Sequence, residues 1–199
     1  MRRTALRFSL RKHGFSVRRP RVWPTKAISS MFRPSENDRK RGTRRVLSTK
    51  DETRAAVVEI VARANRGLAI LTPDLEPDIY DHDEFLETVK RFLLQRTFAR
   101  VRVLISNPQR TFKQGNRFVD VGRRLNSYIE FRNLKAEYQD HAEAFCIADE
   151  TAVVYRARAD SWEGMADTYE PGVARKYLAV FEQLWQASRP DAEPRRQRG

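Results

Sequence analysis

The stretch from Ala142 to Asp160 constrains the fold most strongly, because it holds two apolar segments separated by a short acidic turn. Residues 142–148 and 151–155 are rich in apolar, β-branched and aromatic side chains, and Asp149 and Glu150 lie between them. Apolar, β-branched segments on both sides of a tight turn are typical of a β-hairpin. The stretch therefore predicts two antiparallel strands.

Upstream of this hairpin, short apolar runs alternate with segments of helical period. Buried strands are predicted at residues 68–72 and 101–106, and a half-buried strand at residues 128–132. Strands that alternate with helices favour parallel pairing, so we expect an α/β fold. The sheet is predicted to be mixed but mostly parallel, with helices on both faces, a closing β-hairpin and a C-terminal helix. The expected helices begin at the capping-box pattern of residues 49–52, and cover residues 83–96, residues 111–125 and the segment that starts at Pro171.

The formal net charge of +13 is concentrated at the N-terminal end of the chain. Residues 1–47 hold 15 Lys and Arg against two acidic residues, whereas residues 48–188 carry a net charge of −2. We therefore expect a basic, disordered extension over residues 1–47, a folded domain over residues 48–188 and a disordered Pro/Arg tail over residues 189–199. A basic arm of this kind is typical of nucleic-acid binding, of an organelle transit peptide, or of an extension with no dedicated role.

Residues 74–87 contain seven Asp or Glu and no Lys or Arg. Oxygen ligands at this density suit a divalent cation, but the spacing matches no calcium loop. We favour a structural explanation, in which Asp81 to Glu84 cap the helix that follows. No metal site is expected, since His13, His82 and His141 are far apart, and no phosphate-binding or dinucleotide-binding glycine motif points to a cofactor.

The single cysteine, Cys146, excludes an internal disulfide and favours a reducing compartment. No apolar run approaches the roughly 18 residues that a membrane span needs. We therefore expect a bacterial cytoplasmic protein, with organelle targeting by the Arg-rich N-terminus as the alternative.

An apolar strand, an Asp and a second apolar strand, after two strand–helix units, resemble one half of the phospholipase D superfamily fold. That family's motif is His-x-Lys, four residues, Asp, six residues and Gly-Ser-x-x-Asn. With its Asp placed on Asp149, the His and Lys positions hold Ala142 and Ala144. The Gly-Ser positions hold Arg156 and Ala157, and the Asn position holds Asp160.

The resemblance implies that this chain lacks the family's chemistry, because alanine supplies neither a nucleophile nor a phosphate-binding cation. His141 lies one residue before the motif's His position, and a shift of one residue turns a strand side chain to the other face. Residues 50–188 also resemble an uncharacterised proteobacterial domain found C-terminal to GNAT-type acetyltransferases. The chain has no acetyl-CoA-binding loop, so that activity is not expected here.

The candidate ligand-binding residues are those expected near the ends of the strands. Arg156 and Arg158 alternate along the strand and are predicted to face one side, where they could bind phosphate or remain solvated. No catalytic residue is assigned. The full set is Arg117, His141, Asp149, Tyr155, Arg156, Arg158, Asp160 and Trp162.

Three hypotheses about function follow from the sequence. The first is a non-catalytic phospholipase D-like module that binds nucleic acid through residues 1–47, or another phosphate-bearing ligand. The second is a protein-interaction or accessory domain that forms a homodimer or accompanies an enzyme. The third is an enzyme with a relocated site built from His141, Asp149 and Arg156.

Overall fold

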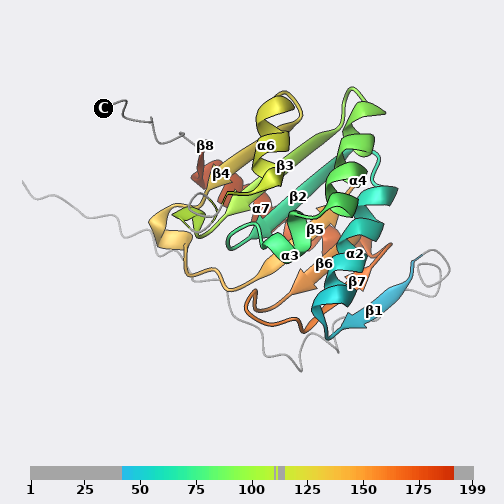
Figure 1. Ribbon diagram of the computed structural model, residues 1–199. Helices are drawn as coiled ribbons and strands as arrows, with labels where there is room; N and C mark the ends of the chain where they lie inside the picture. Colours follow the sequence, from blue (N-terminus) through green and yellow to red (C-terminus); the bar gives the residue numbers. More distant parts are fainter. Residues whose placement is uncertain (1–41, 110, 112–114, 191–199) are drawn as a thin grey trace, which may run out of the picture. The chain divides into compact units, whose positions relative to one another are not determined.

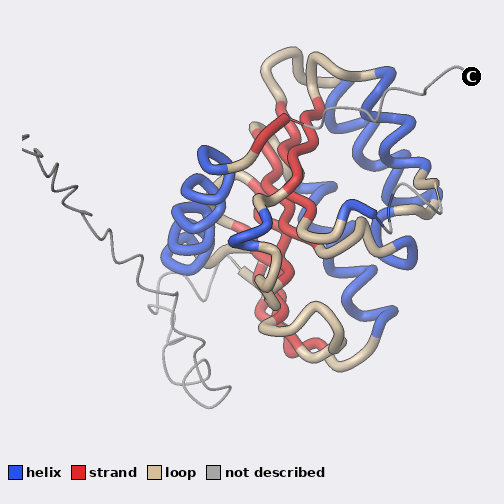
Figure 2. The backbone as a smooth tube through the Cα atoms, turned by 90° about the vertical axis from the view of Figure 1, so that its left-hand side faces the viewer, coloured by secondary structure: helices blue, strands red, loops and turns tan. Residues whose placement is uncertain are grey.

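The computed structural model describes residues 42–109, 111 and 115–190, which form one eight-stranded mixed sheet with helices on both faces. Figure 2 shows the sheet nearly edge-on, with α7 (Pro171–Ala187) on one face and the other α-helices on the opposite face. Those other helices are α2 (Lys50–Arg63), α3 (Pro77–Tyr80), α4 (Asp83–Leu94) and α6 (Arg117–Arg124). The strands are β1 (Arg44–Leu47), β2 (Gly67–Thr72), β3 (Arg100–Ile105), β4 (Ile129–Asn133), β5 (Ala144–Ala148), β6 (Ala152–Arg156), β7 (Gly164–Asp167) and β8 (Arg189–Pro190).

The strand order is β1-β7-β6-β5-β2-β3-β4-β8 (Figure 1). The predicted mixed α/β fold with a closing hairpin and a C-terminal helix is confirmed, but the expectation of mostly parallel pairing is wrong. Only β2–β3 and β3–β4 are parallel among the described strand pairs, and the other five pairs are antiparallel. The reason is that β1, β7 and β8 come from segments without a strand period in the sequence, and each pairs antiparallel with its neighbour.

β1 also moves the start of the folded domain. Arg44–Leu47 pairs with β7, so these residues, predicted as part of a disordered extension, belong to the sheet. The rest of that extension, residues 1–41, and tail residues 191–199 lie outside the described residues. Residues 157–170, where no strand was predicted, contain β7. Short strands like these gain their stability from the neighbouring strand rather than from their own composition.

The first residues of three helices test the helix starts predicted from local sequence. Thr49 forms the predicted capping box with Glu52 at the start of α2. α4 begins as expected, but its N-cap is His82, whose Nδ1 accepts a hydrogen bond from the Phe85 backbone N–H. α6 begins at Arg117 rather than near Thr111, because the Asn116 side chain caps it.

Alternating side chains of the strands divide the core between the two faces of the sheet. Leu68 and Ile70 of β2 pack with residues of α2 and α4, together with Cys146 of β5. On the other face, Phe145 contacts Tyr177 of α7 with ring centroids 5.6 Å apart. The hairpin turn has positive φ angles at both Asp149 and Glu150, which matches the right-handed twist of the flanking strands.

Candidate functional site

An open pocket of about 630 Å³ lies at the carboxyl end of β2. β5 runs antiparallel to β2, with Leu71 opposite Phe145, so the chain just before β5 meets the chain just after β2. The segment after β6 closes the same end, since the Ala159 N–H donates to the Ala142 carbonyl at 2.6 Å. The lining residues are Pro73, Asp74, Glu76, Pro77 and Asp78 from the loop after β2, and His141, Ala142, Arg158, Ala159, Asp160 and Trp162 from the two ends of the hairpin.

A buried ion pair joins the two sides of this pocket. Nη2 of Arg156, a residue only 3% exposed, donates to the Glu76 carboxylate oxygens at 2.5 and 2.6 Å. Its Nη1 donates to the carbonyls of Ala159 and Ser161, and the guanidinium lies 5.1 Å from the ring centroid of Trp162. Burial raises the pKa of the Glu76 carboxyl, and the charge of Arg156 offsets part of that rise. Arg156 is thus fully engaged within the protein.

Arg158 is engaged as well, in an exposed pair on the pocket rim. Its Nε and Nη2 donate to the two carboxylate oxygens of Asp160 at 2.9 and 2.6 Å. Hydrogen bonding from Arg158 lowers the pKa of Asp160, and the same bond raises the pKa of Arg158. The two arginines therefore do not form the paired phosphate site that their alternation suggested.

Carboxylates outnumber cations around the pocket. Asp74, Glu76, Asp78 and Asp160 all line it, and among the residues that the structure describes Arg158 is the one Arg or Lys in the lining. Lys50 contacts Asp78 from α2, with Nζ 3.1 Å from Oδ1. A phosphodiester would meet net negative charge here, so the pocket does not favour an anionic ligand.

His141 lines the pocket but makes weak contacts. Its side chain is 14% exposed, and its Nε2 lies 3.8 Å from a carboxylate oxygen of Glu143. Among the described residues Nε2 has no hydrogen-bond partner. A general base needs a positioned partner within about 3.2 Å, so this geometry does not by itself build a catalytic dyad.

Three of the predicted site residues lie elsewhere. Asp149 is at the opposite end of β5 from Ala142, and its carboxylate accepts hydrogen bonds from the backbone N–H groups of Asn65, Arg66 and Gly67 at 2.5, 2.6 and 3.0 Å. This anchors the hairpin turn to the loop before β2, which is a structural role.

Tyr155 faces α7, on the side of the sheet away from Arg156. Its ring stacks on Tyr177 with centroids 4.3 Å apart, and its hydroxyl donates to Glu143 at 2.8 Å. Burial raises the pKa of Tyr155 well above the usual value. Tyr155 is therefore part of the core beneath α7 and does not reach the pocket.

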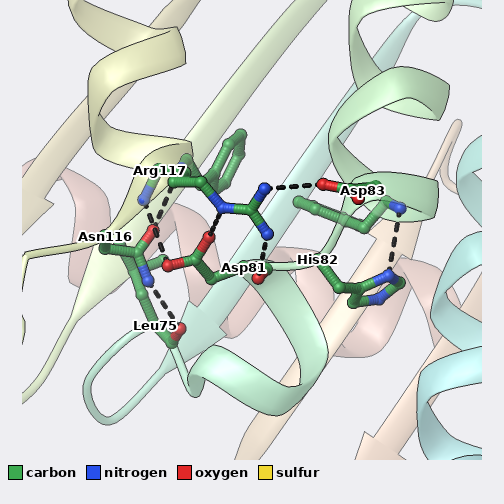
Figure 3. Close-up of polar contacts among 8 residues, drawn as sticks. Leu75, Asp81, His82, Asp83, Asn116 and Arg117 are labelled. Carbon is green, nitrogen blue, oxygen red and sulfur yellow. Dashed lines mark hydrogen bonds and ion pairs between the residues drawn. The ribbon is translucent and has the colours of Figure 1, made fainter.

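Arg117 lies at the start of α6, where it links two acidic residues around the start of α4 (Figure 3). Its Nε donates to Asp81 Oδ1 at 2.7 Å and its Nη1 to Asp83 Oδ1 at 2.6 Å. The hydrogen bonds from Arg117 lower the pKa of Asp83. Beside them, Asn116 donates to the Leu75 carbonyl and caps α6. Arg117 therefore ties two helix starts together and is not in the pocket.

The structure adds Asp74, Glu76 and Asp78 to the candidate site. Sequence reasoning attributed the acidic stretch to helix capping, and Asp81 and Asp83 do lie at the start of α4. The available signal was the position of Asp74, Glu76 and Asp78 directly after a buried strand, because strand ends form clefts in α/β sheets. Within the described residues, no group of three or more His, Cys, Asp or Glu is placed to hold a metal ion.

Solved structures that include phospholipase D family members share the fold of this chain. Nuc from Salmonella typhimurium, a phospholipase D family member, matches with a TM-score of 0.52 and 14% identity, over 76% of this chain and 99% of that one. NucT from Helicobacter pylori matches with a TM-score of 0.51 and 12% identity, over 76% and 99%. The predicted phospholipase D-like fold is thereby confirmed.

A third structure with this fold is TrmBL2, an archaeal chromatin protein described as showing a novel mode of DNA binding. Its TM-score is 0.57 and its identity 13%, over 83% of this chain and 60% of TrmBL2. The chain itself belongs to the family described as Domain of unknown function (DUF7931), whose model matches residues 49–196. No curated protein matches the sequence. Among the described residues, no helix is long and apolar enough to cross a membrane.

Proposed function

We propose that this chain is a non-catalytic phospholipase D-like module that binds nucleic acid. The observation that carries the non-catalytic part is the composition of the pocket. With the family motif placed on Asp149, the nucleophile position is Ala142, which lines the pocket, and the phosphate-binding position is Ala144, which is buried in β5. Neither methyl group can attack phosphorus, donate a proton or bind a phosphate oxygen.

The remaining polar groups of the pocket do not compensate for these two alanines. The Glu76–Arg156 pair is buried, and its guanidinium already donates to four protein oxygens. Arg158 is paired with Asp160, the residue at the motif's Asn position. Both cations are held by carboxylates, so the described residues offer a transferring phosphoryl group no unpaired cation in the pocket.

The nucleic-acid part of the proposal rests on charge outside this pocket. Residues 1–47 carry the basic excess of the chain, and a chain segment of this charge binds polyphosphate by releasing counterions. The DNA binding ascribed to TrmBL2 is compatible with the proposal, since it links this fold to DNA in a chromatin protein. Association driven in this way is expected to weaken steeply with salt.

Fluorescence anisotropy with labelled mixed-sequence DNA and RNA tests the proposal at two salt concentrations. The full chain should bind with a steep salt dependence, and a variant that begins at residue 42 should bind more weakly with a shallower one. That start keeps β1, whose residues pair with β7. Absence of binding by the full chain at low salt would refute the nucleic-acid assignment.

A second candidate function is protein interaction, and one observation favours it. β1 is an edge strand of the sheet, and its Val46 side chain is 80% exposed. Unpaired edge strands are templates for pairing with another chain, including a second copy. Mass photometry of the full chain tests this: a dimer that Val46→Lys converts to monomer supports it, and a monomeric wild type at micromolar concentration counts against it.

A further inference from the structure

Three loops gather arginines and aromatic rings at the end of the sheet opposite the pocket. They are residues 64–66 before β2, residues 95–99 before β3 and residues 125–128 before β4, and they lie together because these strands are parallel neighbours (Figure 1). Backbone hydrogen bonds join them, from the Arg100 N–H to the Arg66 carbonyl at 3.1 Å and from the Val101 N–H to the Tyr128 carbonyl at 2.8 Å. We call this surface the basic loop face; its members are Arg66, Arg96, Phe98, Arg100, Arg124 and Tyr128.

The positive charge of this face is not neutralised by carboxylates. Arg96 donates to the Asn65 side-chain oxygen at 2.9 Å, and Arg100 donates to the carbonyls of Thr97 and Ala99. In the described part of the chain, no hydrogen bond or ion pair engages the exposed Arg66 side chain. The three loops contain no Asp or Glu. Neutral partners hold the guanidiniums in place and leave their charge available to an anion.

Acidic side chains border this face on two sides. Asp83, Glu87 and Asp120 line a surface pocket together with Arg124, and the hairpin turn lies beside the loop before β2. The Asp149 carboxylate is turned inward onto the N–H groups of residues 65–67, which stabilise its negative charge. Glu150, the other residue of the turn, is exposed. Residues 42–190 hold 23 Lys and Arg against 22 Asp and Glu, so four arginines on one face are a local excess of positive charge on a nearly neutral domain.

Aromatic and apolar groups are exposed among these arginines. Phe98 is 63% exposed, and Leu94, the last residue of α4, is 73% exposed. The Arg100 guanidinium lies 5.4 Å from the ring centroid of Tyr128, and that of Arg96 lies 6.0 Å from the ring centroid of Phe92. Arginines near the ends of α2, α4 and α6 also stabilise the helix dipoles, but that role does not account for an exposed phenylalanine between Arg96 and Arg100 in the sequence.

We propose that the basic loop face binds single-stranded nucleic acid, with the arginines on the phosphates and Phe98 stacking on an unpaired base. This inference rests on the proposed function, and it assigns nucleic-acid binding to a surface of the folded domain. A positively charged surface that carries an exposed aromatic ring, here Phe98, is the combination used for single strands. Base faces are accessible to a side-chain ring in a single strand and stacked inside a duplex, so the exposed ring favours the single strand.

The test uses the full chain and a labelled mixed-sequence DNA of about 20 nucleotides, longer than a typical single-strand site. The loop variant R66Q/R96Q/R100Q is compared with a matched control, K135Q/R175Q/K176Q, which removes the same charge from exposed positions outside both this face and the pocket. We expect the loop variant to bind about tenfold or more weakly, with a salt slope smaller by about 2, since each phosphate contact on a single strand contributes about 0.7. The control should stay within about twofold of wild type.

Phe98→Ala separates stacking from charge. Because Phe98 is exposed, the substitution does not open the core, and it should weaken single-strand binding about fivefold or more without changing the salt slope. The inference would be overturned if the loop variant and the control lost DNA affinity equally and Phe98→Ala bound DNA like the wild type. That result would leave the proposed function standing. Failure of the wild type to bind DNA would overturn both. A loop variant that loses the wild type's binding to phosphatidylserine vesicles but still binds DNA would make this face a membrane site and overturn the inference.

Discussion

Glu76 and Arg156, 80 residues apart in the sequence, form a buried ion pair that joins the loop after β2 to the end of β6. Glu76 lines the pocket at the carboxyl end of β2, and Arg156 is buried behind it. It couples the parallel half of the sheet to the antiparallel half.

We expect Glu76→Ala to destabilise the protein by about 3–5 kcal/mol, because it leaves the Arg156 guanidinium buried without its counter-charge. The double variant Glu76→Leu/Arg156→Met should cost much less than the sum of the two single substitutions, since it removes both buried charges. Urea unfolding of the four proteins in this cycle measures the coupling. Arg158→Ala, which breaks an exposed pair, is the control and should leave stability unchanged. Losses of unfolding free energy that simply add for the Glu76 and Arg156 substitutions would contradict the coupling.

Asp149→Ala should destabilise the protein by about 1–3 kcal/mol, because three backbone N–H groups lose their acceptor. Asp149→Asn is expected to lose less, since asparagine retains one oxygen and tolerates the positive φ of 53°. Glu150→Gln, at the neighbouring turn residue, is the control and should have little effect. Thermal unfolding measures all three, and equal stability of Asp149→Ala and wild type would refute the anchoring role.

His82 should make stability depend on pH below about 6.5, the pKa of an unperturbed histidine. Burial, followed by the charge of Arg54, lowers the pKa of His82, so the unfolded chain takes up this proton more readily than the folded one. The stability that neutral His82 contributes is therefore complete above that pH and is lost as the pH falls through the lowered pKa of the folded state. Protonation of Nδ1 would also remove the acceptor of the Phe85 N–H, an N-cap that contributes about 1 kcal/mol.

The measurement is urea unfolding of wild type and His82→Asn between pH 5 and pH 8, a range that spans the titration of histidine. Asparagine keeps an N-cap acceptor and does not titrate, so the difference between the two proteins should narrow or reverse at the acidic end. Parallel stability curves for the two proteins would contradict the prediction.

The chain and its His141→Ala variant should hydrolyse a chromogenic phosphodiester no faster than buffer alone. The physical reason is that, within the described parts of the chain, Nε2 of His141 has no positioned partner closer than the 3.8 Å contact to Glu143 and no unpaired cation lines the pocket. Product release followed by absorbance is sufficient. Turnover by the wild type that disappears in His141→Ala would instead establish an enzyme with a relocated site.

Local sequence patterns correctly predicted about half of the candidate site residues. His141, Arg158, Asp160 and Trp162 were predicted and do line the pocket, because all four lie at the open end of a hairpin that the sequence defines. Arg117, Asp149 and Tyr155 were predicted and lie elsewhere.

The sequence by itself determined the elements whose signals are local: the hairpin turn, the α2 capping box and the buried runs of β2 and β3. Only the tertiary structure decided that most strand pairs are antiparallel and that Arg44–Leu47 belongs to the sheet. It also decided that Arg156 binds Glu76 and that Asp149 binds the loop before β2. A periodicity or a cap is set by residues within one helical turn or one strand. The partners of β1, Arg156 and Asp149 lie about 80 or more residues away, and local composition does not specify them.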